Sequence, residues 1–341
     1  MKLQDSIQPV RVVALGGGTG LSTVLRGLKA YVASRRVTTK PRPISDLAAV
    51  VTVTDDGGSS GRLRREYRVL PPGDIRNCMV ALSKDEHLLT QLFRYRFPGN
   101  GSLGGHSFGN LFLTALTDVT GDFSDAIRVS AEVLAIRGRI FPSTEQNVTL
   151  EAELEDGSVV EGETRISKSR KPIRRIRLVP RHVHPHPETL RAIRQADLIL
   201  LGPGSLYTSI IPNLLVDGVI EAIARSRGIC VYIANLMTQP GETQHYSVAD
   251  HVRAIYEHTR REVFDYVVIN RAPVAPRLLR RYKAQGAEQV APSYSELHRM
   301  GVKYVAGDLL QQDSVVRHDH TRLARLLLDH FVAAPKRLTA R

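Results

Sequence analysis

The sequence contains no tryptophan, and aromatic residues make up only 6% of its 341 residues. Proteins that bind single-stranded nucleic acid stack the bases on aromatic side chains, so the shortage of aromatics argues against that function. The formal net charge is nevertheless +13, and a positive balance of this size favours anionic partners. We therefore expect a small anionic ligand and no specific nucleic acid.

Cysteine is also scarce, with only Cys78 and Cys230 in the chain. Both lie among apolar residues, which favours buried free thiols over a disulfide and is typical of a cytoplasmic protein. No apolar run approaches the roughly 20 residues of a membrane span, and the N-terminus lacks the pattern of a signal peptide. We therefore expect a cytoplasmic protein without a transmembrane segment.

Buried strands that run into glycine-rich loops recur along the sequence, and the first of them is near the N-terminus. Residues 10–15 (VRVVAL) predict a strand, residues 16–20 (GGGTG) a loop, and residues 21–31 a helix with apolar residues at helical spacing. In doubly wound domains such a loop admits a phosphate to the helix N-terminus. The loop lacks the Gly-Lys-Ser/Thr ending of a P-loop, and no acidic residue follows about 20 positions later at a strand end. We therefore expect no NAD, and no flavin.

The longest of these junctions covers residues 50–77 (VVTVTDDGGSSGRLRREYRVLPPGDIRN). β-Branched residues predict a buried strand that stops at Asp55 and Asp56, and a glycine-serine run and several arginines follow. Backbone amides and guanidinium groups suit phosphate, and a carboxylate can hold a divalent cation against it. Adjacent strand residues point to opposite faces, so only one aspartate should reach the ligand unless the turn has already begun. The alternative for this stretch alone is a solvated turn, since Asp, Gly and Ser are ordinary turn residues.

Polar knots of similar character recur at residues 104–110 (GGHSFGN), 202–214 and 235–243. In the first of them His106 and Asn110 are four residues apart, so they would share one face at a helix start. The alternative is that the serine between them only caps the helix and His106 is a satisfied core residue. Five predicted strands end in glycine-rich or Asn/Thr/Gln-rich loops, and open parallel sheets bind ligands beyond the carboxyl ends of their strands. We therefore predict one large anion-binding cleft.

The order of the predicted elements indicates an α/β protein with a Rossmann-like, doubly wound and mostly parallel sheet. We expect residues 10–137 and 186–335 to form a single ligand-binding domain of this kind. Residues 138–185 alternate as β-strands do around Asp156-Gly157, a strong hairpin turn. They predict a small β-rich insertion.

Two basic segments are expected to lie on the surface, and the first of them away from the cleft. The run at residues 168–181 (KSRKPIRRIRLVPR) falls in the insertion, where its charge is expected to form a solvated face. Residues 31–47 are polar, basic and contain proline, which is typical of a surface loop.

Taken together and in order, these junctions resemble the YvcK-like family, the so-called gluconeogenesis factors. The resemblance spans nearly the whole chain from Val10, and RHD at residues 317–319 is similar to the family's C-terminal pattern. A more distant relative is CofD, the phospholactate transferase of coenzyme F420 synthesis, which has the same fold. The matching segments are ALGGGTG (14–20), VTVTDDGGSSGRLR (51–64), LPPGDIRNC (70–78), GHSFGNLFLTAL (105–116), LGPGSLYTSIIPNLLV (201–216) and NLMTQPGET (235–243).

The resemblance implies a Rossmann-like fold that binds uridine diphosphate sugars, above all UDP-N-acetylglucosamine. It also implies a cytoplasmic role in cell shape and peptidoglycan synthesis during gluconeogenic growth, together with an unidentified protein partner in cell-wall synthesis. No settled enzymatic activity comes with the family. Carried over to this sequence, GGGTG would meet the phosphates, and Asp55 and Asp56 match the acidic pair at the metal and phosphate centre of the transferases. Asn213 and the Asn235 loop would line the nucleotide side.

The predicted site therefore combines backbone, acidic, basic and amide groups. Mg²⁺ is the candidate cofactor, with Asp55 and Asp56 as its predicted ligands. The predicted ligand-binding residues are Gly17, Gly18, Thr19, Gly20, Thr54, Asp55, Asp56, Ser59, Gly61, Arg62, Asp74, Arg76, Asn77, His106, Asn110, Gly204, Ser205, Asn213, Asn235 and Thr238.

Two functions stay open for this cleft. The first is a regulatory protein that binds a nucleotide sugar. The second is a metal-dependent transferase, similar to CofD, that moves a phosphoryl-containing group from a nucleotide-linked donor. Both use the same fold, so the fold does not separate them, and a homo-oligomer is compatible with either.

Overall fold

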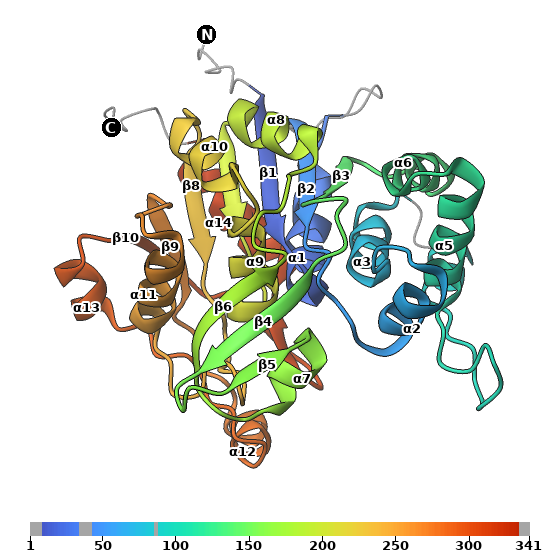
Figure 1. Cartoon of the computed structure of the whole chain (residues 1–341). Coiled ribbons are helices and arrows are strands. Elements are labelled where there is room, and N and C mark those ends of the chain that lie inside the picture. The colour runs from blue at the N-terminus through green and yellow to red at the C-terminus, as the bar shows by residue number, and fades with distance from the viewer. Residues whose placement is uncertain (1–8, 34–42, 85–87, 334–341) are drawn as a thin grey trace, which may run out of the picture.

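The computed structural model of the protein describes residues 9–33, 43–84 and 88–333. Its centre is a seven-stranded sheet with the order β10-β9-β8-β7-β1-β2-β3 (Figure 1). Neighbouring strands of this sheet all pair in parallel. The strands are β1 (Val10–Gly16), β2 (Ile44–Val51), β3 (Arg139–Pro142), β7 (Leu198–Leu201), β8 (Ile229–Ile233), β9 (Tyr266–Asn270) and β10 (Lys303–Gly307).

Helices cover both faces of this sheet, and the strand sequences reflect it. β7 reads LILL and is buried along its whole length, because a strand covered on both faces is a continuous apolar run. On one face α1 (Gly18–Leu28), α3 (Gly73–Leu82) and α14 (His320–Phe331) pack together, and on the other α8 (Pro187–Gln195) packs with α10 (Val219–Arg225) (Figure 1). The predicted α/β fold with a doubly wound, mostly parallel sheet is confirmed.

The strand order reverses at the centre of the sheet. From β1 the chain proceeds outward to β2 and β3, and it then returns to β7, on the other side of β1, before it proceeds to β8, β9 and β10. The loops that follow β1 and β7 diverge at this point, and open α/β sheets bind their ligands in the resulting crevice. The topology therefore brings GGGTG after β1 next to GPGS after β7.

The second strand begins earlier than predicted. β2 starts at Ile44, so residues 44–47 belong to the sheet and not to a surface loop. The polar pair Ser45-Asp46 conceals the strand in the sequence, although Ile44 and Leu47 are fully buried. Asp46 has a partner across the sheet, since it accepts a hydrogen bond from Arg139 Nε at 3.0 Å. Residues 34–42 of the predicted loop lie outside the described residues.

Helix α2 (Gly58–Tyr67) contains most of the glycine-serine run whose backbone amides were expected to suit phosphate. Glycine and serine have low helix propensity, so the sequence GGSSG did not indicate a helix start. Burial of Leu63 holds the helix against the core, and α3 then begins at Gly73. The glycine-serine run is therefore the N-terminal part of a helix and not a free anion-binding loop.

The insertion forms a separate antiparallel sheet with the order β5-β4-β6, in front of the main sheet in Figure 1. It comprises β4 (Thr149–Leu154), β5 (Val159–Glu161), helix α7 (Glu163–Lys168) and β6 (Ile173–Val179). β4 and β5 pair across the predicted Asp156-Gly157 turn. β3, which the sequence placed with the insertion, pairs instead with β2 in the main sheet.

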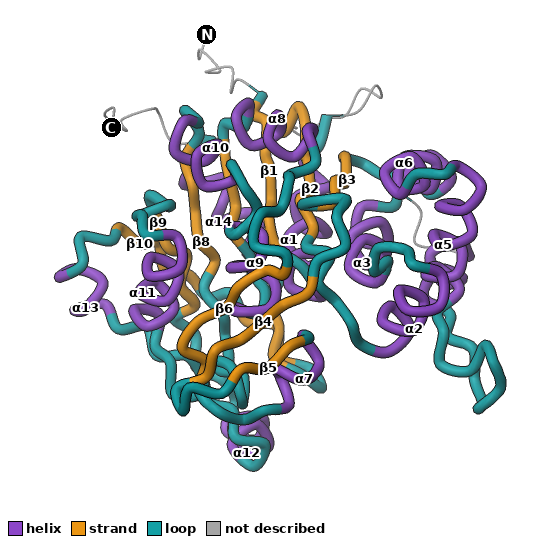
Figure 2. Tube along the Cα trace, in the orientation of Figure 1, coloured by secondary structure: helices purple, strands orange, loops and turns teal. Residues whose placement is uncertain are grey.

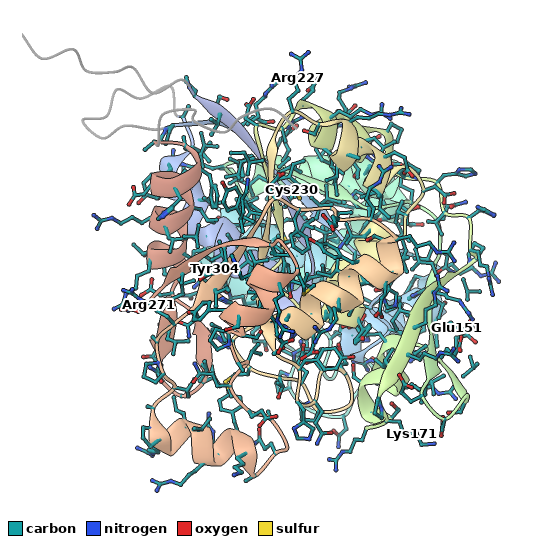
Figure 3. The ribbon with its side chains drawn as sticks, turned by 90° about the vertical axis from the view of Figure 1, so that its left-hand side faces the viewer. Glu151, Lys171, Arg227, Cys230, Arg271 and Tyr304 are labelled. Carbon is teal, nitrogen blue, oxygen red and sulfur yellow. The ribbon has the colours of Figure 1, made fainter. Side chains whose placement is uncertain are left out.

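The basic run of the insertion is partly neutralised by acidic residues of β4. Arg174 and Arg177 both form ion pairs with Glu153, at 3.1 and 2.9 Å. Figure 3 shows Glu151 of β4 and Lys171, which precedes β6, at the margin of the molecule. The backbone N–H of Ile176 donates to His258 Nε2 at 2.9 Å, which ties the insertion to α11 (Val248–Thr259).

The remaining elements complete the layers around the sheet (Figure 2). Cys78 and Cys230 are buried and form no disulfide, as predicted; Figure 3 labels Cys230. Within the described residues no single helix is long and apolar enough to cross a bilayer. One pair of helical segments, 206–214 and 219–225, has the length and composition of a membrane span when taken together, but the pair is bent by 71°. The other elements are η1 (Lys29–Tyr31), α4 (Leu88–Arg94), α5 (Phe108–Thr120), α6 (Phe123–Val133), η2 (Leu206–Ile210), α9 (Ile211–Leu214), α12 (Pro276–Lys283), α13 (Tyr294–Arg299), β11 (Leu310–Gln312) and β12 (Val316–His318).

Candidate functional site

The glycine-rich loop after β1 presents an open face. Gly18 has a φ of +60°, and no atom lies within 4 Å of the position that a Cβ would take there. Gly20 lies instead against the loop after β7, where a Cβ would be 2.3 Å from the carbonyl oxygen of Pro203. The first amide groups of a helix have no acceptor within the helix, so the start of α1 suits an anion at this face.

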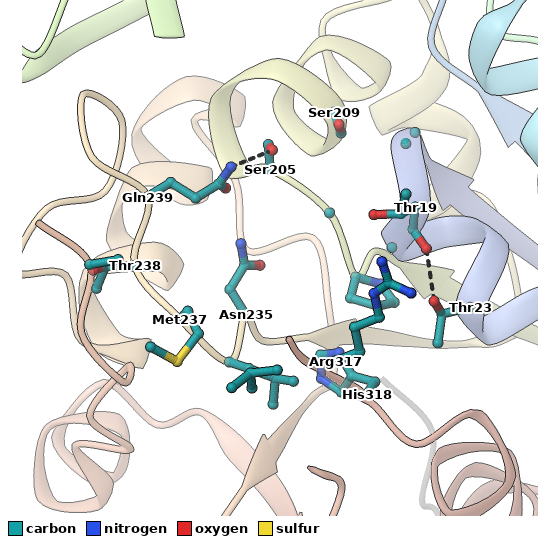
Figure 4. A pocket seen from close by; sticks show the side chains of 18 of the residues that line it. Thr19, Thr23, Ser205, Ser209, Asn235, Met237, Thr238, Gln239, Arg317 and His318 are labelled. Atoms are coloured by element: carbon teal, nitrogen blue, oxygen red, sulfur yellow. Dashed lines mark hydrogen bonds between the residues drawn. The ribbon is translucent and has the colours of Figure 1, made fainter. Parts of the chain in front are cut away.

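A cavity of about 580 Å³ opens beside this loop, at the carboxyl ends of the central strands. Its volume falls in the range of small-molecule sites, roughly 300–1,000 Å³. Figure 4 shows Thr19 and Thr23 of α1 on one side and Ser205, Asn235 and Gln239 on the other. Ten of the predicted ligand-binding residues line it: Gly17, Gly18, Thr19, Gly20, Asp55, Asp74, Gly204, Ser205, Asn235 and Thr238.

Three carboxyl groups, Asp55, Asp74 and Glu163, line the same cavity. Burial, followed by the charge of Asp55, raises the pKa of Asp74 to about 6, although a hydrogen bond from the Gly18 backbone acts in the opposite direction. Burial, followed by the charges of Asp55 and Asp74, raises the pKa of Glu163 well above its usual range. Burial and the neighbouring negative charges therefore disfavour the ionised forms of Asp74 and Glu163.

Asp56 faces away from this cavity. Its Oδ1 accepts hydrogen bonds from the backbone N–H and the hydroxyl of Thr164, at 2.9 and 2.6 Å. Asp55, which lines the cavity, accepts from the backbone N–H of Gly57 with its Oδ1 at 2.9 Å. The two adjacent carboxylates thus diverge, although both follow the end of β2 at Val51 and lie outside the strand. Asp56 instead holds α7 of the insertion in place.

The polar knot at residues 104–110 forms a buried network between α5 and α2. Ser59 Oγ lies 3.1 Å from His106 Nδ1 and accepts from Asn110 Nδ2, also at 3.1 Å. Ser107 caps α5 by accepting from the backbone N–H of Asn110. None of these four residues lines the main cavity. The geometry therefore favours the structural alternative, in which the knot fixes α5 against α2.

Two arginines and one glycine of the predicted site make their contacts within the protein. Arg62 donates to the carbonyl oxygen of Gly104 at 2.7 Å, and a Cβ at Gly61 would lie 1.8 Å from the carbonyl oxygen of Asp56. Arg76 donates to Asn77 Oδ1 at 2.7 Å. Asn77 lines a smaller cavity beside the main one. These residues belong to α2 and α3, and none of them lines the main cavity.

Thr54 and Asn213 lie directly behind the cavity wall. Thr54 Oγ1 donates to Glu163 at 3.4 Å. Asn213 Nδ2 donates to the carbonyl oxygens of Gly16 and Ser209, at 3.0 and 2.7 Å. Asn213 therefore joins the end of β1 to the segment after β7, and it positions the glycine loop without lining the cavity.

Several wall residues were not among the predicted set. Glu163 reaches the cavity from α7, so the insertion contributes to the site, contrary to the expectation that it lies away from the cleft. Gln239 donates to Ser205 Oγ at 2.9 Å. Arg317 and His318 come from β12, and the RHD segment was their only signal, because a three-residue strand carries no periodicity.

The chain is similar to one protein family and to solved structures. A family model described as 2-phospho-L-lactate transferase CofD matches residues 12–310. The chain belongs to the CofD family. A crystal structure of a Bacillus halodurans protein superposes on this CofD-family protein with a TM-score of 0.89 at 43% identity, covering 94% of this chain and 100% of that one.

Two curated relatives of this CofD-family protein show which branch it resembles. It is 45% identical over 323 residues to the "Gluconeogenesis factor" of Bacillus subtilis, covering 94% of this chain and 98% of the relative. It is 47% identical over 327 residues to the "Putative gluconeogenesis factor" of Nostoc sp., covering 95% of this chain and 69% of the relative. The predicted resemblance to the gluconeogenesis factors is therefore confirmed.

Glu242 of this CofD-family protein is a buried acid behind the cavity. Its Oε1 accepts from the Ser167 hydroxyl at 3.0 Å, which joins the loop after β8 to the insertion. Burial raises the pKa of Glu242 to about 7, although the hydrogen bond from Ser167 acts in the opposite direction. The folded protein therefore holds this proton more tightly than the unfolded chain does.

Glu242→Gln is expected to remove a destabilisation that grows with pH. The raised pKa means that protonation stabilises the fold below pH 4.5, and that this contribution is lost as the pH rises to about 7. The free energy of unfolding of the variant, minus that of the parent, should grow over this interval by up to about 3 kcal/mol. Urea unfolding of both proteins across the interval measures it. Parallel pH curves for the two proteins would contradict the assignment of the proton to Glu242.

Proposed function

We propose that this protein binds a UDP-sugar, with UDP-N-acetylglucosamine as the preferred ligand, and that the diphosphate rests on the glycine loop after β1. The observation that carries the proposal is the cavity of about 580 Å³ at the reversal of strand order, with the open face of Gly18 and the start of α1 on its wall. Backbone amides at a helix N-terminus favour phosphate. The resemblance to the gluconeogenesis factors supports the choice of the uridine nucleotide.

Amide side chains on the far wall suit the nucleoside and the sugar. Asn235 Oδ1 and Gln239 Oε1 are buried and have no hydrogen-bond partner within the described part of the chain. Both residues line the cavity, and a buried acceptor without a partner is costly. Donor groups of a ligand, such as the N–H of a pyrimidine or a sugar hydroxyl, would satisfy them.

The proposed role is that of a regulator in the cytoplasm. It would act on cell shape and peptidoglycan synthesis under gluconeogenic growth, through an unidentified protein partner in cell-wall synthesis. The similarity to proteins named gluconeogenesis factor supports this role. In such a protein, binding of the nucleotide sugar would report on the supply of a cell-wall precursor.

A divalent cation fits the acidic side of the cavity. Asp55 has one carboxylate oxygen on Gly57 N–H and the other available, and it faces the same cavity as the glycine loop. Among the described residues no group of three or more His, Cys, Asp or Glu side chains is arranged to hold a metal alone. Mg²⁺ commonly combines one or two carboxylates with substrate phosphates and water, and Asp55 with Asp74 would hold it in that way. When bound, it would neutralise charge between these acids and the diphosphate.

The second candidate function is a metal-dependent transferase that moves a phosphoryl-containing group from a nucleotide-linked donor. The family description, which names a transferase, supports it. The raised pKa values of Asp74 and Glu163 also favour it, because perturbed acids gather at reactive sites. In this function Asp55 and the glycine loop would orient the phosphate, and a neutral Glu163 would hold a proton beside it.

Calorimetric titration with a panel of nucleotide sugars and bare nucleotides, with and without Mg²⁺, tests both functions. We expect UDP-N-acetylglucosamine to bind more tightly than the GDP-sugar of matched size and than UDP alone. Chromatography of each mixture then shows whether a donor is consumed. Turnover would identify the transferase, and equal affinity for all nucleotide sugars would contradict the proposed uridine preference.

A further inference from the structure

A smaller cavity of about 270 Å³ lies beside the main one and shares part of its wall. Thr19, Thr23, Arg317 and His318 line both cavities, so the two meet between the start of α1 and the end of β12. Figure 4 shows these four side chains close together at one side of the main cavity. We call the smaller cavity the basic recess. Residues that line it alone include Ser22, Arg26, Asn77, Arg94 and Asp313.

The recess carries an excess of positive charge. Arg26, Arg94 and Arg317 all line it, and none of the three forms an ion pair with a residue of the ranges that the structure describes. Asp313 is the one carboxylate on its wall, and its Oδ2 accepts a hydrogen bond from Gln311 at 2.7 Å. Three guanidinium groups against one carboxylate attract an anion, and guanidinium groups match phosphate geometry well.

His318 adds a buried hydrogen-bond acceptor at the junction of the two cavities. The residue is 7% exposed, and its Nε2 has no partner within the described ranges. Burial lowers the pKa of His318 to about 4, despite a hydrogen bond with the backbone of Ala234. The ring is therefore neutral, with its proton on the nitrogen that faces the Ala234 carbonyl, which leaves Nε2 as an acceptor. A ligand hydroxyl would satisfy it, whereas an ionised phosphate oxygen, which only accepts hydrogen bonds, would not.

Two hydroxyl groups of α1 add further hydrogen-bond acceptors to the wall of the basic recess. Ser22 and Thr23 donate their hydroxyl protons to the carbonyl oxygen of Thr19, at 2.9 and 2.8 Å. Their oxygens therefore face the recess with lone pairs only. The recess thus offers donors from its arginines and acceptors from α1 and β12, so its ligand must carry both an anion and hydroxyl groups.

We propose that the basic recess binds a phosphate monoester that carries a free hydroxyl, with the phosphate on Arg26 and Arg94 and the hydroxyl on His318 Nε2. Such a ligand lies next to whatever fills the main cavity, since the two share four wall residues. The recess therefore makes the protein a two-ligand receptor. The proposal does not depend on the identity of the ligand in the main cavity.

Calorimetric titration of the full-length protein with glycerol 3-phosphate, inorganic phosphate and glycerol tests the proposal. We expect glycerol 3-phosphate to bind more tightly than inorganic phosphate, and glycerol not to bind measurably. In the double variant Arg26→Gln/Arg94→Gln, the affinity for glycerol 3-phosphate should fall by at least about tenfold, because charge-assisted hydrogen bonds are lost. Both side chains are exposed, so the variant should fold.

The matched control is the double variant Arg322→Gln/Arg325→Gln, which removes two exposed arginines from α14 outside the recess. It should bind glycerol 3-phosphate as the parent does. Gly18→Val, which alters only the main cavity, should also retain this binding, so failure of the UDP-sugar proposal and failure of this one are distinguishable. No binding of glycerol 3-phosphate to the parent, or equal binding to the Arg26/Arg94 variant, would overturn the proposal.

His318→Phe tests the hydroxyl contact separately. The change keeps a ring of similar size and removes the acceptor, so glycerol 3-phosphate should bind only as tightly as inorganic phosphate. The affinity for inorganic phosphate itself should not change. A preference for glycerol 3-phosphate that survives in this variant would overturn the assignment of the hydroxyl to His318, and the arginine variants decide the phosphate contact independently.

Discussion

Gly18→Val is expected to lower the affinity for UDP-N-acetylglucosamine by at least about 100-fold, a loss of roughly 2.8 kcal/mol in binding free energy. The Cβ position of Gly18 has no protein atom within 4 Å and lines the main cavity. A branched side chain there fills the space where the phosphate would approach the amide groups of α1. Calorimetric titration of the folded variant measures the loss.

The matched control for this change is Gly301→Val. Gly301 has a φ of +70°, it also has open space at its Cβ position, and it lies outside the main cavity. A side chain at positive φ costs roughly 1–2 kcal/mol of stability in either variant, so urea unfolding should show similar losses for both. Only Gly18→Val should lose the ligand. If both variants bind UDP-N-acetylglucosamine as the parent does, the glycine loop does not hold the diphosphate.

Much of the fold could be predicted from the sequence because its central strands are covered on both faces. Strands such as LILL at residues 198–201 then appear as unbroken apolar runs. The helix predicted over residues 21–31 from its apolar spacing corresponds to α1, which begins three residues earlier, and to η1. The failures occurred where local propensity and tertiary packing disagree. Ser45-Asp46 conceals the start of β2, and the glycines at the start of α2 conceal a helix that Leu63 anchors in the core.

The glycine loop and Asn235 could also be predicted to line one cavity, because parallel strands bring their carboxyl ends to one edge of the sheet. What could not be predicted is which polar residues satisfy one another. Ser59, His106 and Asn110 have the composition of a site, but they form a closed network. Glu163 reaches the cavity because Asp56 holds α7 against the segment after β2. Such a contact between residues far apart in the sequence cannot be predicted from a local pattern.

The carboxylates of Asp55 and Asp74 on the wall of the main cavity can be used to test whether a cation bridges the protein and the diphosphate. Without a cation, Asp55 and Asp74 would face the phosphates across the cavity, and like charges at close range repel. Deleting the negative charge of Asp55 would then strengthen binding. With a Mg²⁺ bridge the same deletion removes a hard oxygen ligand together with its charge, and binding would weaken. The two cases therefore predict opposite signs for one substitution.

Asp55→Asn is expected to weaken the binding of UDP-N-acetylglucosamine in the presence of Mg²⁺ by at least about tenfold. A chelator should weaken binding to the parent and leave the variant unchanged, because the variant has already lost the cation. Asp56→Asn is the matched control at the next residue. The Oδ1 of asparagine can still accept from Thr164, as Asp56 does, so this variant should keep both its affinity and its dependence on Mg²⁺.

Titration of the parent and both variants, with Mg²⁺ and again with a chelator, separates the outcomes. Tighter binding by Asp55→Asn in both conditions would show that Asp55 only repels the phosphates. Equal affinities in all three proteins would show that Asp55 does not contact the ligand or its cation. A loss that follows Asp55 alone, and only when Mg²⁺ is present, would identify the carboxylate that holds the cation against the diphosphate.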